Sequence, residues 1–450
     1  MARALFAVVV SVVALFVSLA LLVTGSTLLG TLSAVRMGLE GMPATTIGLV
    51  MAGHAIGFVT GTIYAVSVIR RVGHIRAFAA FAAMACAVTL AHPLHVDAAL
   101  WFGLRVVLGF SVAGMLMVVE SWISGRATSD NRGALLGAYT FNFYLASAAG
   151  QFLFALAEPV SFVPFSVVAM LMVLSLVPLC LTDAQVPVLN TSGARLRFRE
   201  LIAASPSGVS AALTGGVVLG AFLAMGPVYA LRVGIEGGEL AAYMGIASLS
   251  AMLMQWPAGW ASDIYGRRRV LVGLAALGAL AAALVALFGA TFVPGLFVLT
   301  GVMVAAGASL YPVGLANAND HLHSDHAVAA SSGMLRCYGI GTIIGPIAGA
   351  VVMGLLGPAG LFAFLGVCLL LLALLVYYRV SYIPGVPLAE QGDYVSVTPV
   401  STPVIITLDP RNEDFEQWQP TAGVEDHDVA DALELGEVSP DTDDDGDHSR

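Results

Sequence analysis

Two arginines lie inside long apolar stretches of this 450-residue chain, where a charged side chain is costly and is a functional candidate by default. Arg105 and Arg336 each stand about 10 to 12 Å from the nearer end of a predicted helix, too deep to anchor at the headgroups. No Asp or Glu falls near the middle of any apolar stretch. An unpaired buried guanidinium favours a bound anion, which can accept bidentate hydrogen bonds. The alternative, that these arginines only brace backbone carbonyls, stays open, above all for Arg336.

Further polar side chains interrupt the same apolar stretches. His54 has an imidazole with an unperturbed pKa of about 6.5, which suits a proton carrier. The alternative for His54 is a structural hydrogen bond to a neighbouring helix. The other members of this polar set are Tyr64, Tyr139, Asn142, Tyr144, Gln151, Gln255, Trp256, Tyr311 and Tyr338, and we single out Tyr139, Asn142, Gln255, Trp256 and Tyr311. Some of them are expected to be packing residues.

A charged loop with a regular spacing separates two of the apolar stretches. It reads Gly259-x-x-x-Asp263-x-x-Gly266-Arg267-Arg268-Arg269. Three arginines in so short a loop hold it on the cytoplasmic side of a membrane. A weaker copy, Arg70-Arg71-Val72-Gly73, has its glycine 193 residues before Gly266 and has an arginine in place of the acid.

A second pair of related sites supports an internal repeat. Glu120 lies 13 residues before Gly133, and Asp320 lies 13 residues before Gly333, which is an offset of 200 residues. Each acid ends an apolar stretch, and each glycine opens the next. Duplicated halves of this kind are typical of transporters.

The elements that carry these residues are predicted to be membrane-spanning helices. Hydrophobic residues make up 58% of the chain and charged residues 11%, far below the roughly 25% charged residues of a soluble domain. With about 20 residues for each crossing, the chain holds twelve spans in an all-α fold of two six-helix bundles. The predicted spans are 5–31, 45–69, 76–92, 98–122, 133–157, 160–181, 208–232, 240–262, 270–290, 294–317, 328–356 and 358–379.

Arginine placement predicts the orientation. With the N-terminus inside, thirteen arginines fall in cytoplasmic segments and only Arg36 and Arg232 in external loops. Both termini are therefore expected in the cytoplasm, and we expect the cytoplasmic (inner) membrane of a bacterium. The predicted divisions are an N-terminal bundle at 1–181, a cytoplasmic central loop at 182–207, a C-terminal bundle at 208–379 and an acidic disordered tail at 380–450.

The chain resembles the major facilitator superfamily, in whose members a loop like the Gly259 motif joins the second and third helices of each half. Arg105-x-x-x-Gly109 and Gly341-x-x-x-Gly345-Pro346-x-x-Gly349 are similar to two further motifs of that family. Glu120-Ser121-Trp122, Arg132-Gly133 and Asn317-Ala318-Asn319-Asp320 also resemble the YcaD-like bacterial branch. This likeness covers roughly residues 1 to 380 and implies a secondary transporter that works by alternating access.

The resemblance implies roles for the polar residues. It places Arg105, His54, Tyr139, Asn142, Gln255, Trp256, Tyr311 and Arg336 around a central substrate cavity. It also implies a cytoplasmic gate in which Asp263 approaches Arg132 and Gly133, Arg267 pairs with Asp320, and Glu120 pairs with Arg70 or Arg71. The gate residues are Gly259, Asp263, Gly266, Arg267, Arg268, Arg71, Gly73, Glu120, Asp320 and Arg132. The solute is interpreted as an organic anion, with proton coupling left open.

The sequence supports other functions and sites less well. The run from Asp320 to His326 holds three histidines and two aspartates, but such short tracts are poor evidence for a metal site. No P-loop is present, so ATP-driven transport is not supported. We expect no cofactor, no metal site, no enzymatic activity and no binding of nucleic acid. The expected partners are the lipid bilayer and a small solute. The protein is expected to be a monomer. A polytopic membrane enzyme and a receptor that signals through its tail remain alternatives, and Val395 to Leu408 could form a short interacting strand instead of disordered chain.

Overall fold

The structure, a computed structural model, describes residues 2–128, 130–156, 158–181, 198–289, 291–322, 327–392, 394–398, 400–402 and 404–408. The described chain is helical and contains no β-strand. Most of the predicted central loop, 182–197, and the end of the tail, 409–450, lie outside these ranges. The α-helices are α1 (Ala2–Leu39), α2 (Ala44–Val72), α3 (His74–Ala91), α4 (Ala98–Ser124), α5 (Arg132–Leu153), α6 (Val163–Leu174), α7 (Leu176–Cys180), α8 (Phe198–Ala204), α9 (Pro206–Arg232), α10 (Gly237–Tyr265), α11 (Arg267–Phe288), α12 (Val293–Asn319), α13 (Ala327–Leu356) and α14 (Ala359–Tyr382).

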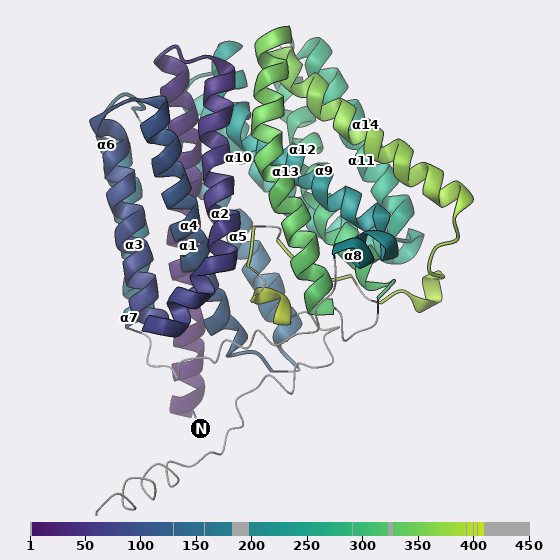
Figure 1. Ribbon diagram of the computed structural model, residues 1–450, viewed down its shortest axis with the longest axis horizontal. Coiled ribbons are helices and arrows are strands. Elements are labelled where there is room, and N and C mark those ends of the chain that lie inside the picture. Colours follow the sequence, from purple (N-terminus) through teal and green to yellow (C-terminus); the bar gives the residue numbers. More distant parts are fainter. Residues whose placement is uncertain are drawn as a thin grey trace, which may run out of the picture.

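The long helices stand roughly side by side in two groups, as Figure 1 shows in purple to blue for the first half and in teal to green for the second. Among the described residues, ten helical segments are long and apolar enough to cross a membrane. Counting α5 and α10, which are more polar, and taking α6 with α7 as one span gives the twelve spans that the sequence predicts. The fold class is therefore confirmed as two six-helix bundles of an integral membrane protein.

The internal repeat predicted from the sequence also appears in the backbone dihedral angles of corresponding loops. Gly73 between α2 and α3 has φ 85° and ψ 162°, and Gly266 between α10 and α11 has φ 86° and ψ 146°. Both lie in a region that is essentially reserved for glycine, which explains why the two loops share this residue. Gly41 and Gly234, at φ 73° and 84°, repeat the same correspondence in the loops after α1 and α9, again 193 residues apart.

Glycines also set the distance between helices within each half. On α2, Gly53, Gly57 and Gly61 face α4 so closely that a Cβ at Gly57 would lie 1.9 Å from the carbonyl oxygen of Val106. In the second half, a Cβ at Gly216 of α9 would lie 2.1 Å from the oxygen of Tyr338 on α13. Small residues at every fourth position allow such close approach of two membrane helices.

The two halves meet at one end of the molecule. We call the end that carries Arg70, Arg71, Arg126, Arg132, Arg267, Arg268, Arg269 and Arg379 the arginine-rich end, and the other the opposite end. At the opposite end, a Cβ on Gly48 of α2 would lie 2.3 Å from the Cβ of Ala350 on α13. Gly245 of α10 likewise packs on the ring of Phe152 from α5. These contacts bring the two halves close together at the opposite end.

The chain after α14 differs from the disordered tail expected from residue 380. Its described residues run back beneath the second half and enter the space between α5 and α13 at the arginine-rich end, drawn in yellow-green in Figure 1. Two short 3-10 turns lie in it, Leu388–Glu390 and Ile405–Leu408. Val397, Thr402 and Leu408 are fully buried, so this part of the tail belongs to the packed body of the protein. The strand considered for Val395 to Leu408 does not form in the described residues.

Candidate functional site

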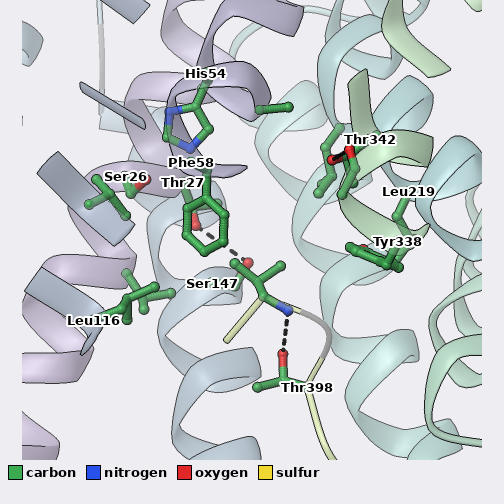
Figure 2. Close-up of a pocket in the computed structure, with 18 of the residues that line it drawn as sticks. Ser26, Thr27, His54, Phe58, Leu116, Ser147, Leu219, Tyr338, Thr342 and Thr398 are labelled. Carbon is green, nitrogen blue, oxygen red and sulfur yellow. Dashed lines mark hydrogen bonds between the residues drawn. The ribbon is translucent and has the colours of Figure 1, made fainter. Parts of the chain in front are cut away.

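A cavity of about 430 Å³ lies between the two halves. Residues from both halves line it, and Figure 2 shows Ser26, Thr27, His54 and Ser147 from the first half opposite Leu219, Tyr338 and Thr342 from the second. The volume falls in the range of small-molecule sites, roughly 300 to 1,000 Å³. The lining is mainly apolar with hydroxyl groups, and none of its described residues is an Asp or Glu.

Arg105 provides a buried positive charge in this lining. Its side chain is only 4% exposed, and its Nε has no hydrogen-bond partner among the described residues. No described carboxylate forms an ion pair with it. Since a buried charge without a partner is costly, this guanidinium is suited to an anionic ligand in the cavity.

The α2–α4 contact fixes the position of Arg105. A Cβ at Gly109 would lie 2.0 Å from the carbonyl oxygen of His54, and one at Gly53 would lie 3.4 Å from the Cβ of Arg105. The imidazole of His54 also lines the cavity, and its Nδ1 has no hydrogen-bond partner among the described residues. The glycines thus bring two polar side chains from different helices to one wall of the cavity.

Arg336, on α13, adds a second guanidinium to the lining from the other half. It is exposed, in contrast to Arg105, because it opens onto the cavity. Of the polar residues predicted from the sequence, the structure thus places Arg105, His54 and Arg336 in the lining, together with Tyr144, Gln151 and Tyr338.

The other predicted cavity residues lie elsewhere. Tyr139 is buried and donates to the carboxylate of Glu120, and Asn142 donates to the carbonyl of Phe16 on α1. Tyr311 packs edge-on against the lining residue Tyr338 with ring centroids 5.4 Å apart. Gln255 sits just outside the lining, 3.4 Å from the hydroxyl of Tyr144, which does line the cavity.

Trp256 is the clearest correction. It is 77% exposed, on the outer face of α10 together with Leu253 and Trp260. Consecutive residues of a helix point about 100° apart. Because Gln255 faces inward, Trp256 is turned toward the lipid side of the bundle.

Of the remaining polar lining residues, only Tyr144, Gln151 and Tyr338 belong to the polar set predicted from the sequence. The others are serines and threonines, which are too common in apolar helices to mark a site. Within this set, Thr31 donates to Gln151 at 2.6 Å and Thr27 donates to Ser147 at 3.5 Å. The polar members are Ser26, Thr27, Thr31, Thr62, Tyr144, Ser147, Gln151, Ser248, Ser332, Tyr338, Thr342 and Thr398.

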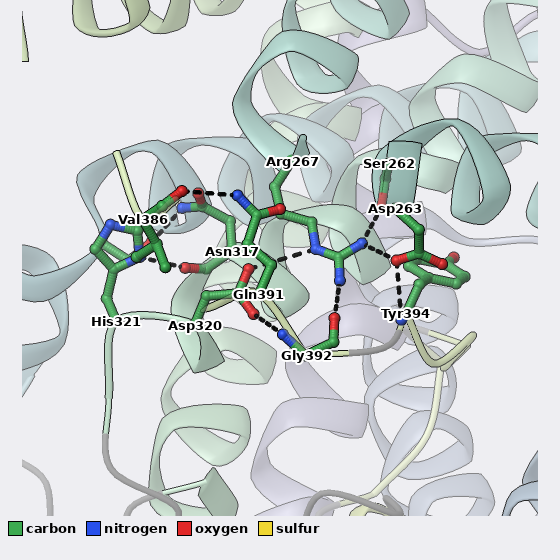
Figure 3. Close-up of polar contacts among 11 residues, drawn as sticks. Ser262, Asp263, Arg267, Asn317, Asp320, His321, Val386, Gln391, Gly392 and Tyr394 are labelled. Carbon is green, nitrogen blue, oxygen red and sulfur yellow. Dashed lines mark hydrogen bonds and ion pairs between the residues drawn. The ribbon is translucent and has the colours of Figure 1, made fainter. Parts of the chain in front are cut away.

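The predicted gate motif forms a polar cluster at the arginine-rich end, shown in Figure 3. The side chain of Arg267 is only 1% exposed and lies 2.5 Å from Asp263 and 3.4 Å from Asp320. The predicted pairing of Arg267 with Asp320 is therefore present. Arg268 donates to the carbonyls of Ile383 and Pro384 at the start of the tail.

The other predicted gate contacts are replaced by contacts with the tail. The carboxylate of Asp263 accepts a hydrogen bond from the backbone N–H of Tyr394 at 3.1 Å, and the Tyr394 ring packs over Gly259. Glu120 is fully buried and accepts from Thr402. Arg71 is exposed and Arg132 is partly buried at the same end. These tail contacts use mainly backbone groups, which no sequence motif marks.

The arrangement of two helical halves around a central cavity is the major facilitator fold of membrane transporters. The family described as Major Facilitator Superfamily matches residues 239–411. A relative from Escherichia fergusonii named as the uncharacterized MFS-type transporter YcaD is 29% identical over 354 residues, 76% of this chain and 88% of the relative. The predicted resemblance to this superfamily and to its YcaD-like branch is thus confirmed.

Solved structures show the same fold. The nucleoside transporter NupG aligns with a TM-score of 0.65 at 14% identity over 84% of this chain and 99% of its own. A bacterial homolog of the human lysosomal transporter Spinster, in an inward-facing and occupied conformation, aligns with a TM-score of 0.66 at 14% identity over 85% and 97%. At this identity the likeness concerns the fold alone. The family match, the relatives and the multi-pass helical fold together indicate a transmembrane transporter.

Proposed function

We propose that this transporter moves a small organic anion by alternating access through the cavity between its halves. The observation that carries the proposal is the buried guanidinium of Arg105, which lines the cavity without a hydrogen-bond partner for its Nε among the described residues. Arg336 adds a second cation, and the described lining contains no carboxylate to neutralise either. A carboxylate or phosphate group can accept two parallel hydrogen bonds from a guanidinium.

The different contacts between the halves at the two ends of the molecule support alternating access. Glycine contacts close the opposite end, whereas at the arginine-rich end the halves are bridged by the tail rather than by one another at Glu120 and Asp263. Rocking of the halves about the central site would exchange which end is closed. The gate residues Gly259, Asp263, Gly266, Arg267, Arg268, Arg71, Gly73, Glu120, Asp320 and Arg132 are proposed to control that exchange.

The proposal includes the orientation of the protein in the membrane. The arginine-rich end faces the cytoplasm of a bacterium, and both termini lie there, because positively charged loops are retained on that side. The protein functions as a monomer in the cytoplasmic membrane. Reporter fusions at residue 190 and after residue 385 should both report cytoplasm, and an external signal from either would overturn this topology.

The anion proposal is tested by substituting Arg105→Lys in purified protein reconstituted into liposomes. Lysine keeps the charge but loses the planar fork, so uptake of an accepted organic anion should fall about tenfold. Arg76→Lys, at an exposed arginine outside the cavity, is the matched control and should leave uptake unchanged. A counterflow screen of organic acids, sugars, amino acids and drug-like cations identifies the solute. Normal flux from Arg105→Lys, or preference for cations in the parent, would refute the proposal.

A further inference from the structure

The part of the tail from residue 391 to residue 408, which we call the tail segment, binds the second half through its backbone. Gly392 accepts a hydrogen bond from Arg267 through its carbonyl and donates its N–H to Asp320 at 3.2 Å. Tyr394 donates its N–H to Asp263, and Ser396 donates to Gln255 at 3.3 Å. The segment therefore occupies the polar cluster of the gate motif, as Figure 3 shows for its first residues.

The same segment binds the first half a few residues later. Thr140 donates to the carbonyl of Ser396 at 3.3 Å, and Ser124 donates to the carbonyl of Val404 at 3.4 Å. Thr402 donates both its N–H and its hydroxyl to the carboxylate of Glu120, at 2.9 and 2.5 Å. The segment thus bridges the two halves across the opening between them.

Between these two sets of contacts the segment reaches the central cavity. Thr398 and Val400 are lining residues of the cavity, and Figure 2 shows Thr398 at its edge. Val397, Thr398, Ser401 and Thr402 are fully buried. The buried tail segment therefore lies on the path that a solute would take between the cavity and the arginine-rich end.

The two carboxylates that hold the segment are related by the internal repeat. Glu120 and Asp320 end corresponding helices, α4 and α12, at an offset of 200 residues. Each accepts a backbone N–H of the segment, from Thr402 and from Gly392 respectively. Ten residues separate these donors, and an extended chain of ten residues spans at most about 33 to 36 Å. One short peptide can therefore engage both halves at equivalent positions.

We propose that the opening at the arginine-rich end is a peptide-binding site whose occupant is the chain's own tail segment, and that the bound segment inhibits transport by closing the cavity at this end. The inference rests on the proposed function only in that the cavity is the transport route. Residues 383–390 tether the segment to α14, so it is held near its site at an effective concentration on the order of millimolar. A modest intrinsic affinity then keeps the site occupied while still allowing release.

The test measures access to the cavity and needs no solute. A single reporter, Ser147→Cys, is placed in the cavity lining of protein whose native cysteines are replaced. These replacements are Cys86→Ala, Cys180→Ser, Cys337→Ala and Cys368→Ala. The protein is held in nanodiscs, so both ends meet a polar maleimide, and the labelling rate is compared between a chain ending at Tyr382 and one ending at Leu408. The longer chain is the matched control, since it keeps the tail segment and lacks only residues 409–450.

The chain ending at Tyr382 should label about a hundredfold faster than the control, as expected if the site changes from about 1% open to fully open. Adding a synthetic peptide of residues 391–408 at about 1 mM should slow labelling again, whereas a scrambled peptide should not. In the full-length chain, Thr402→Val removes the hydroxyl donor to Glu120 and should raise the rate about tenfold. This variant keeps the test informative if the truncated chain does not fold.

Labelling of the chain ending at Tyr382 within twofold of the control, with Thr402→Val also unchanged, would overturn the proposal. Loss of anion uptake in both chains would instead count against the proposed solute. The two failures are thus distinguishable. Faster labelling accompanied by faster uptake is the result expected of an inhibitory segment.

Discussion

The closest helix contact beside the cavity makes a quantitative prediction for Gly57→Ala. The new Cβ would lie 1.9 Å from the oxygen of Val106, 2.7 Å from its carbonyl carbon and 2.9 Å from the N of Phe110. Real Cβ contacts are essentially never shorter than 3.0 Å, so α2 and α4 must separate by about 3.0 − 1.9 = 1.1 Å. Backbone atoms cannot rotate away, and overpacking of this kind costs about 1 to 3 kcal/mol.

The control for this prediction is Gly103→Ala on the same helix as Val106, where nothing lies within 4 Å of the new Cβ. Alanine in a helix interior should there be neutral or stabilising by about 0.5 to 1 kcal/mol. Stability is measured as the free energy of unfolding in mixed micelles titrated with a denaturing detergent. Because Arg105 neighbours Val106, Gly57→Ala should also reduce uptake. Equal stability of the two variants would refute the argument that glycine contacts set the α2–α4 distance.

Two further predictions concern the loops and the histidine. Gly73→Ala should destabilise the protein by about 1 to 3 kcal/mol, because φ 85° with ψ 162° suits only glycine, although nothing lies within 4 Å of the new Cβ. The control is Gly273→Ala within α11, and the free energy of unfolding in mixed micelles is measured for both variants. Equal stability of the two variants would contradict backbone strain at Gly73. His54→Gln removes the only titratable side chain in the described cavity lining besides its arginines and tyrosines. If transport is coupled to protons through His54, solute accumulation driven by a pH gradient should be lost while counterflow persists. His74→Gln, outside the cavity, should retain both, and gradient-driven accumulation by His54→Gln would exclude His54 as the proton carrier.

The fold was predictable because the bilayer imposes strong constraints on sequence. Helix length and arginine placement follow from the thickness and charge asymmetry of a membrane, and the predicted spans 98–122 and 328–356 agree with α4 (Ala98–Ser124) and α13 (Ala327–Leu356) to within two residues. Buried charge is rare there, so Arg105 stood out from sequence alone.

The rest of the site could not be predicted for identifiable reasons. The resemblance predicts Trp256 at the cavity from the span that carries it, but the span does not fix which face of the helix a residue occupies. Ser147 and Thr342 belong to residue types that occur throughout apolar helices. The tail segment binds mainly through backbone groups and hydroxyls, as at Gly392 and Thr402, and these leave little trace in the sequence.

The contacts of the tail segment bear on the conformational cycle. The resemblance to the superfamily predicts that, when the arginine-rich end is closed, Asp263 approaches Arg132 and Glu120 approaches Arg70 or Arg71. In this structure, the two carboxylates instead accept from Tyr394 and Thr402. Because the segment contacts both halves and occupies these carboxylates, its binding should oppose gate closure.

This competition predicts that removing the tail segment shifts the protein toward the state that is open at the opposite end. Leu156 and Leu355, 86% and 79% exposed, lie in different halves at that end and suit paired spin labels as Leu156→Cys and Leu355→Cys. A chain ending at Tyr382 should show a second population at longer distance in a pulsed spin-label measurement, and a chain ending at Leu408 should keep a single one. A ligand shifts a two-state equilibrium only through its different affinity for the two states, so the size of the new population measures how strongly the segment prefers the present state. Identical distance distributions in the two chains would mean that the segment binds both states equally and that its contacts with Glu120 and Asp263 do not oppose gate closure.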